Sequence, residues 1–310
     1  MFLRSFFISL STNKALRRFS ESSGMGRRVS RRFVAGTTIA EAAAVAETLN
    51  REGIAVTLDC LGESVLHVAQ AEESAAAYQR TLHEIHARGL NANVSLKLTQ
   101  MGMDIGGPGA GPALAERIVG ELVAQAAGID NFVRIDMEGS EYTEATVQMT
   151  ERLNALHPGC VGTVLQAYLY RTEQDMERLF AQGIRIRLCK GAYKEEADKA
   201  FPEKANVDAN YVKLMKRAVT SGVYCGIATH DEAIIEEMRR FVEEGGASKD
   251  AFEFQMLYGI RRDLQRKLVQ DGYRMRVYVP FGTEWYPYFM RRLAERPANV
   301  LFLAKNFFRS

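Results

Sequence analysis

The sequence has little cysteine, and its cysteines do not form pairs. The 310 residues include four cysteines that lie far from one another, at Cys60, Cys160, Cys189 and Cys225. Because none forms a CxxC pair, a cysteine zinc site or redox couple is disfavoured. The globular composition, with 47% hydrophobic residues, excludes a disulfide-stapled miniprotein. We therefore predict reduced thiols in the core of a cytoplasmic protein.

The sequence also lacks long apolar stretches and a large net charge of either sign. No run reaches the roughly 20 apolar residues that a membrane-spanning helix needs, so any membrane contact would be peripheral. With 47% hydrophobic and 25% charged residues, the composition excludes a disordered or collagen-like chain. The 40 Lys and Arg nearly balance the 38 Asp and Glu, and the formal net charge of +2 indicates no nucleic acid partner.

Positive charge is concentrated at the amino end. Residues 1–36 contain eight basic residues and a single acid, Glu21, which gives this segment +7 and the remainder −5. An Arg-rich, acid-poor start could be a mitochondrial transit peptide. We favour an amphipathic helical segment over residues 1–50 that covers the main body. Its cations leave open a peripheral contact with an anionic membrane at the inner face of the cell membrane.

From residue 53 onward, short apolar runs alternate with stretches of helical periodicity. The first helix shows the pattern, because Ala75, Tyr78, Leu82 and Ile85 recur at spacings of three and four. Eight apolar runs rich in Val, Ile and Leu read as strands: 53–60, 93–98, 132–137, 162–168, 184–190, 223–229, 252–257 and 275–280. We predict one (β/α)8 TIM barrel, distorted from the regular form, over residues 51–310, with a C-terminal tail.

A doubly wound sheet is the competing fold. Such a sheet more often stops at five or six strands and carries a phosphate-binding glycine turn after its first strand. Here that turn reads CLGES (60–64) and lacks GxGxxG. The barrel is therefore the better prediction.

Polar side chains gather at the carboxyl ends of the predicted strands, where barrel enzymes carry their active sites. They are Asp59, Glu63, Lys97, Asp136, Glu138, Gln166, Tyr168, Arg187, Lys190, Thr229, His230, Gln255 and Tyr278. Each could simply be a residue that meets solvent. Together they predict an enzyme with a large polar ligand.

Lys97 is flanked by leucines and should point into the barrel mouth. A buried lysine there is compatible with a Schiff-base lyase. However, Asp136 and Glu63 would keep its ammonium charged, and an anchor for a substrate carboxylate fits equally well. A lyase centred on Lys97 thus stays an alternative.

Two further segments carry cations suited to anionic ligands. Residues 286–297 read as the last helix, in which Arg291 and Arg292 could form a fork for a carboxylate or phosphate. Arg187, Lys190 and Gly191 suit a pyrophosphate, and the helix start after Thr229 and His230 offers backbone amides to the same group. No set of His, Cys and carboxylates has a convincing metal spacing, and we predict no metal.

Nine motifs, in this order, resemble the strand-end motifs of the proline dehydrogenase family. They are TLDCLGE (57–63), VSLKLTQMG (94–102), RIDMEGSEYTEAT (134–146), LQAYLYRT (165–172), RIRLCKGAY (185–193), ATHDE (228–232), EFQMLYG (253–259), RVYVPFG (276–282) and YFMRRLAE (288–295). The resemblance is to the short, monofunctional bacterial type. It implies a (β/α)8 flavoenzyme that oxidises L-proline to Δ1-pyrroline-5-carboxylate, the first step of proline catabolism to glutamate, by hydride transfer from C5 to N5 of FAD.

The resemblance also implies roles for individual residues. Those that would hold proline are Lys97, Leu257, Tyr278, Tyr288, Arg291 and Arg292, with Glu63 as a gate that pairs with Arg291. Those that would bind FAD are Met137, Gln166, Arg187, Lys190, Gly191, Ala192, Thr229 and His230. Asp136 and Arg187 would be catalytic, and it stays open whether Asp136 orients the cations or aids proton loss.

Partners follow from the same resemblance. Electrons would pass to a membrane quinone, and an oligomer is an open option. A non-catalytic barrel that binds a flavin or an amino acid is the alternative outside the enzymes.

Overall fold

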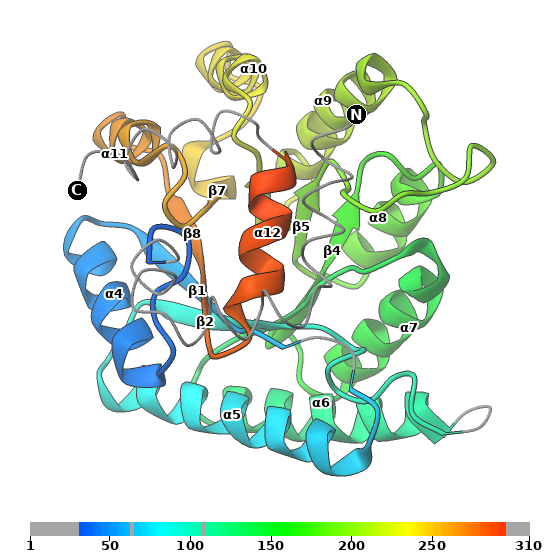
Figure 1. Ribbon diagram of the computed structural model, residues 1–310. Coiled ribbons are helices and arrows are strands. Elements are labelled where there is room, and N and C mark those ends of the chain that lie inside the picture. Colours follow the sequence, from blue (N-terminus) through cyan, green and yellow to red (C-terminus); the bar gives the residue numbers. More distant parts are fainter. Residues whose placement is uncertain (1–30, 63–64, 107–109, 296–310) are drawn as a thin grey trace.

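The structure is a computed structural model that describes residues 31–62, 65–106 and 110–295, and the backbone alone for 291–295. Eight parallel strands close into a barrel in sequence order, from β1 beside β2 round to β8 beside β1 (Figure 1). The strands are β1 (Ala55–Cys60), β2 (Ala92–Leu96), β3 (Val133–Ile135), β4 (Val161–Gln166), β5 (Ile186–Cys189), β6 (Cys225–Ala228), β7 (Phe252–Leu257) and β8 (Met275–Phe281). The predicted barrel is confirmed, with each strand inside or within one residue of its predicted run.

Helices connect the strands and surround the barrel (Figure 1). The ring consists of α4 (Ile39–Arg51), α5 (Val68–Ala87), α6 (Ala110–Ala127), α7 (Ser140–Leu156), α8 (Thr172–Phe180), α9 (Lys204–Val219), α10 (Glu232–Glu243) and α11 (Arg262–Gln270). The expected face of α5 is confirmed, since Ala75, Tyr78, Leu82 and Ile85 are all buried. Gly89 after this helix has φ +59, the left-handed conformation that favours glycine at a helix end.

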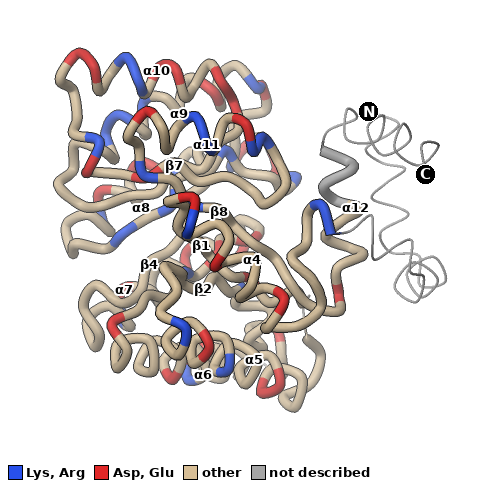
Figure 2. The backbone as a smooth tube through the Cα atoms, turned by 90° about the vertical axis from the view of Figure 1, so that its left-hand side faces the viewer, with Lys and Arg blue, Asp and Glu red and all other residues tan. Residues whose placement is uncertain are grey.

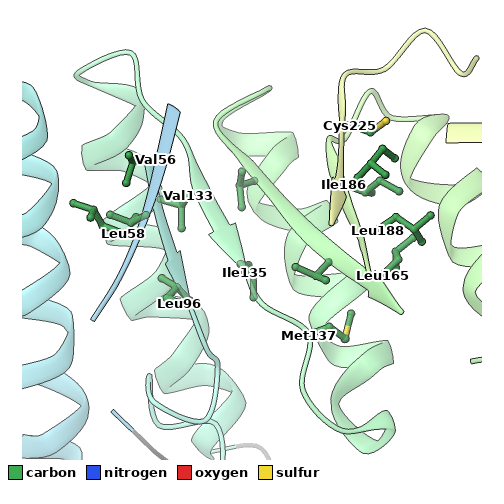
Figure 3. Packing of buried hydrophobic residues seen from close by; sticks show 14 of the residues in the cluster. Val56, Leu58, Leu96, Val133, Ile135, Met137, Leu165, Ile186, Leu188 and Cys225 are labelled. Atoms are coloured by element: carbon green, nitrogen blue, oxygen red, sulfur yellow. The ribbon is translucent and has the colours of Figure 1, made fainter. Parts of the chain in front are cut away.

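The main apolar core lies between the strands and the helices, and Figure 3 shows part of it. Side chains alternate along a strand, so Val56 and Leu58 of β1 belong to this core while Thr57 and Asp59 belong to the other face. The inner face of the barrel is polar: it carries Asn93 and Ser95 from β2, Arg134 from β3, Arg187 from β5, Glu253 and Gln255 from β7, and Arg276 from β8, joined by hydrogen bonds. The strands are largely buried on both faces, but only the outer face is apolar.

The helix after β8 does not complete the ring. Helix α12 (Trp285–Glu295) lies in front of the barrel in Figure 1 and at its end in the side view of Figure 2. Its Trp285 and Phe289 pack in a second apolar cluster with Leu61, which follows β1, and Phe33. Helix α4 instead packs on β1 and β8 and fills the remaining place in the ring. The barrel is therefore distorted as expected, and α12 covers its carboxyl end.

Blue and red segments are mixed along the outer helices in Figure 2. Within the described ranges, no helix combines the length and hydropathy needed to cross a bilayer. The basic segment 1–30, with its transit-peptide and membrane-contact interpretations, lies outside the described residues.

Candidate active site

The carboxylate of Asp136 is the centre of a buried cluster at the carboxyl end of the strands. Asp136 follows β3 directly, and its side chain is 13% exposed. Its Oδ1 accepts hydrogen bonds from Ser95 Oγ at 2.6 Å and Arg187 Nη1 at 2.8 Å. Its Oδ2 accepts from the hydroxyl of Tyr278 at 2.8 Å. Four strands thus meet at one carboxylate.

Arg187 is held on several sides within this cluster. Its Nε donates to Oε1 of Gln255 at 2.5 Å, and its guanidinium lies 5.2 Å from the centre of the Tyr278 ring. A guanidinium on an aromatic face and beside a carboxylate is stabilised by both. The arrangement fixes a buried positive charge at the barrel mouth.

The charge state of Tyr278 is set by the same cluster. Burial and the neighbouring carboxylates of Asp136 and Asp59 raise the pKa of Tyr278 well above its ordinary value. The hydroxyl therefore stays protonated near neutral pH and donates to Asp136.

Lys97 forms an ion pair with a carboxylate that we did not assign to it. Its Nζ lies 3.5 Å from Oδ1 of Asp59, which also accepts from the hydroxyl of buried Tyr78 at 3.2 Å. Burial alone would lower the pKa of Lys97, but Asp59, Asp136 and Glu138 outweigh it, and the pKa is raised. Lys97 is therefore a cation, which suits a carboxylate ligand and disfavours a Schiff-base nucleophile.

Gln166 ends β4 with an unsatisfied acceptor. Its Nε2 donates to the backbone carbonyl of Glu138 at 3.3 Å, while its Oε1 is buried and has no partner among the described residues. Glu138 is itself fixed, since its carboxylate accepts from the backbone and hydroxyl of Thr99 at 3.1 and 2.6 Å. A buried acceptor of this kind fits a ligand that carries an N–H donor.

The expected phosphate-binding residues lie together beyond β5 and β6, with their own partners. Nζ of Lys190 lies 2.5 Å from Asp208 Oδ1 and 2.8 Å from Asp231 Oδ2. Oγ1 of Thr229 accepts from the backbone of Asp231 at 3.1 Å, and Asp231 caps α10 by accepting from the Ala233 amide at 3.2 Å. Two of the amides expected to face a ligand, those of Asp231 and Ala233, are therefore already bonded.

Gly191 and His230 have specific local roles. Gly191 has φ +105, and a Cβ there would lie 2.3 Å from the Tyr168 ring, so only glycine fits this turn. Nε2 of His230 accepts from the backbone amide of Leu257 at 2.9 Å, which joins the loop after β6 to the end of β7. The bond places the proton of a neutral imidazole on Nδ1.

The remaining expected residues are placed to different degrees. Tyr288 is buried in the α12 cluster, Met137 is buried after β3, and Leu257 ends β7 partly exposed. Ala192 is exposed next to Gly191. Arg291 and Arg292 lie on α12, although only their backbone is described. Glu63, and with it the predicted gate, lies outside the described residues.

Several functional neighbours were not predicted from the sequence. The sequence places Asp59 and Gln255 at strand ends without a specific role, and it predicts no role for Ser95 and Glu253. All four occupy inward positions of their strands, so alternation within each strand was the signal that could have found them.

In the described ranges, no group of three or more His, Cys, Asp or Glu is arranged to hold a metal ion.

Comparisons with known proteins place the chain among relatives of similar length. A family model described as proline dehydrogenase matches residues 42–305. Proline dehydrogenase 1 of Bacillus subtilis (strain 168) is 42% identical over 303 residues, which are 98% of each chain. The proline dehydrogenase of Deinococcus radiodurans is 44% identical over 280 residues, 88% of each chain.

Solved structures support the fold. Proline utilization A (PutA) from Bdellovibrio bacteriovorus, inactivated by N-propargylglycine, matches with a TM-score of 0.81 at 23% identity. The match covers 95% of this chain but 36% of that larger protein, so the chain spans about a third of its length.

Proposed function

The chain belongs to the proline dehydrogenase family, and from this premise we propose that the cluster around Asp136 is the active site and that FAD is the cofactor. The enzyme oxidises proline, the first step of proline catabolism. The observation that carries the proposal is the meeting of Arg187, Tyr278 and Ser95 at Asp136, close to the cation Lys97. It supplies fixed charges at the end of the barrel where active sites form.

The residues at the mouth fit a bound flavin. The orphaned Oε1 of Gln166 suits an N–H of the ring, the buried cation Arg187 suits a ring that gains electrons, and the turn at Gly191 lets backbone approach closely. Lys190, Thr229 and His230 would bind the phosphates and ribityl chain, with Lys190 shared between phosphate and its two carboxylates. FAD would supply the hydride acceptor for C5 of proline.

The substrate would be held by charge at one end and by packing at the other. Lys97, Arg291 and Arg292 would bind its carboxylate, while Tyr278, Tyr288 and Leu257 would contact the ring. Glu63 would pair with Arg291 when the site is closed. Holding the ring in one orientation is the main contribution that these side chains make to the rate.

The partners are proposed on the family resemblance. We propose that the reduced enzyme passes its electrons to a membrane quinone, which requires at least a transient peripheral contact with the membrane. A cytoplasmic location at the inner face of the cell membrane is consistent with this contact.

The rate should rise with pH because the substrate loses a proton while Lys97, Tyr278, Cys60 and Cys189 keep theirs. The pKa values of Lys97 and Tyr278 are raised, and burial raises the pKa of the Cys60 thiol to about 12 and that of Cys189 to about 11. Lys97 thus stays charged, and the other three stay neutral, roughly between pH 6 and 9. A neutral amine is the better hydride donor, so kcat/KM should increase up to about tenfold per pH unit while proline is mostly protonated.

Initial rates with L-proline and a soluble quinone analogue measure this profile. Tyr278→Phe should lower the rate but keep the rise, since its hydroxyl does not titrate in this range. A rate that no longer rises with pH in Tyr278→Phe would assign the titration to Tyr278. The absence of any turnover of L-proline by the wild-type protein would contradict the proposed function.

Gln166→Leu should weaken FAD binding about tenfold, because the site loses one neutral hydrogen bond of about 1.5 kcal/mol. The dissociation constant is measured by titrating the apoprotein with FAD and following the fluorescence. Gln265→Leu is the matched control, since Gln265 is equally buried but bonds to the carbonyls of Leu257 and Ile260. Equal FAD affinity in the two variants would place the flavin elsewhere.

A further inference from the structure

Gln255 of β7 reaches across β6 to the active-site arginine on β5. Gly226 makes this possible, because it pairs with Arg187 on one side and with Glu253 on the other. A Cβ at Gly226 would lie 2.3 Å from Nε2 of Gln255. Because glycine has no side chain, the Gln255 amide can occupy the space beside Gly226.

The orientation of this amide is determined by its two neighbours. Oε1 accepts from Nε of Arg187 at 2.5 Å, and Nε2 donates to Oε1 of Glu253 at 2.6 Å. An arginine can only donate and a carboxylate can only accept, so a flipped amide would lose both bonds. Glu253 is anchored in turn by Nε of Arg276 at 2.6 Å.

Among the described residues, the hydrogen bonds of the Arg187 guanidinium involve two of its three nitrogens. Its Nε bonds to Gln255, and its Nη1 bonds to Asp136 at 2.8 Å and to Ser95 at 3.4 Å. Within the described part of the chain, Nη2 makes no hydrogen bond. Because a guanidinium is planar, fixing two nitrogens fixes the direction of the third.

We propose that Gln255 is a positioning residue that, anchored by Glu253, turns Arg187 so that Nη2 is the nitrogen presented to the flavin. The inference rests on the proposed function, since the flavin is the group that Nη2 would meet. A cation held beside a flavin stabilises its electron-rich reduced form. Gln255 thereby contributes to the reduction potential and to kcat without touching substrate.

A purely structural role would give a different result. Gln255 and Gln265 are both buried amides with partners for their polar groups, at 5% and 2% exposure. Gln265 bonds only to backbone carbonyls and does not contact Arg187. Gln265→Met is therefore the matched control for Gln255→Met, since each exchange removes the hydrogen bonds of one buried amide.

Gly226→Ala provides a second, independent variant. Its new Cβ would meet the far end of the flexible Gln255 side chain and displace the amide, while residue 255 itself stays glutamine. This variant decides the question should Gln255→Met fail to fold.

The experiment measures the midpoint potential of the bound flavin in the holoenzyme, together with kcat, KM for L-proline and the melting temperature. Gln255→Met and Gly226→Ala should each shift the equilibrium toward oxidised flavin about tenfold, which is about 30 mV for a two-electron couple. The kcat should fall about tenfold with KM changed less than threefold. Gln265→Met should lower the melting temperature but leave the potential unchanged.

Two results would overturn the inference alone. One is an unchanged potential in Gly226→Ala and in Gln255→Met, or in Gly226→Ala alone should Gln255→Met fail to fold. The other is an equal shift in Gln265→Met. A wild-type protein that binds no flavin would contradict the proposed function and overturn this inference with it.

Discussion

Asp136→Ala should lower kcat/KM for L-proline by at least about 100-fold while the protein stays folded. The exchange removes the acceptor shared by Ser95, Arg187 and Tyr278. Arg187 then keeps its bond to Gln255 but loses its charged partner, and Tyr278 loses the acceptor of its hydroxyl, so both side chains are held less firmly. A displacement of about 1 Å at a reacting centre is enough for a loss of this size.

Asp136→Asn separates the charge of Asp136 from its geometry. The amide oxygen can still accept from Arg187, and the amide nitrogen can donate to the hydroxyl oxygen of Tyr278. The rates should therefore fall in the order wild type, Asn variant, Ala variant. Steady-state kinetics on flavin-saturated protein gives this order.

A surface ion pair provides the matched control. Glu116→Gln breaks a pair with Arg152 at 2.7 Å between α6 and α7, and kcat/KM should change less than about twofold, because exposed pairs contribute little. A decrease of less than tenfold in Asp136→Ala would show that Asp136 does not organise the site.

Glu253→Ala should destabilise the fold by about 3–5 kcal/mol, which is roughly 10 °C in melting temperature. Glu253 is 5% exposed and accepts from Arg276, Gln255 and Tyr224 at 2.6, 2.6 and 3.1 Å. Its removal leaves the Arg276 charge in the barrel without a carboxylate partner.

A double variant shows whether the pair as such is needed. Glu253→Leu combined with Arg276→Met removes both charges, and it should recover much of the lost stability. Thermal unfolding of Glu253→Leu, of Arg276→Met and of the double variant measures the coupling energy between the two side chains. A Glu253→Ala protein that melts within about 2 °C of the wild type would contradict the buried pair.

The same pair has a pH signature. Burial alone would raise the pKa of Glu253, but Arg276 and the hydrogen bonds outweigh it and hold the pKa below its ordinary value. The stabilisation is therefore complete above the ordinary glutamate pKa and is lost as the pH falls toward the lowered one. Glu253→Ala should lose this acid-dependent component.

The barrel was predictable because its signal is local and repeated. Each strand is a run of Val, Ile and Leu, and each helix carries a buried face such as that of Tyr78 and Leu82. The place of α12 was not predictable in this way. Its apolar residues fit either the ring or the mouth, and the choice depends on α4, which packs on β1 and β8.

The site was predictable in its members but not in its pairings. Arg187, Asp136 and Tyr278 could be singled out from strand ends and from family resemblance. Which carboxylate pairs with which cation depends on distances across the barrel. Asp136 helps to keep Lys97 charged, as expected, but the ion pair at 3.5 Å is with Asp59. Glu63 lies outside the described residues. Gln255 reaches Arg187 only because residue 226 is glycine, a relation between three strands that no single segment shows.

The most direct test of the account is anaerobic addition of L-proline to the purified holoenzyme, followed by absorbance. We predict a yellow protein whose flavin band bleaches, with faster bleaching at higher pH and at least about 100-fold slower bleaching in Asp136→Ala. A flavin band that L-proline leaves unchanged, or borohydride trapping of a carbonyl substrate on Lys97, would contradict the assignment of this cluster to flavin-dependent proline oxidation.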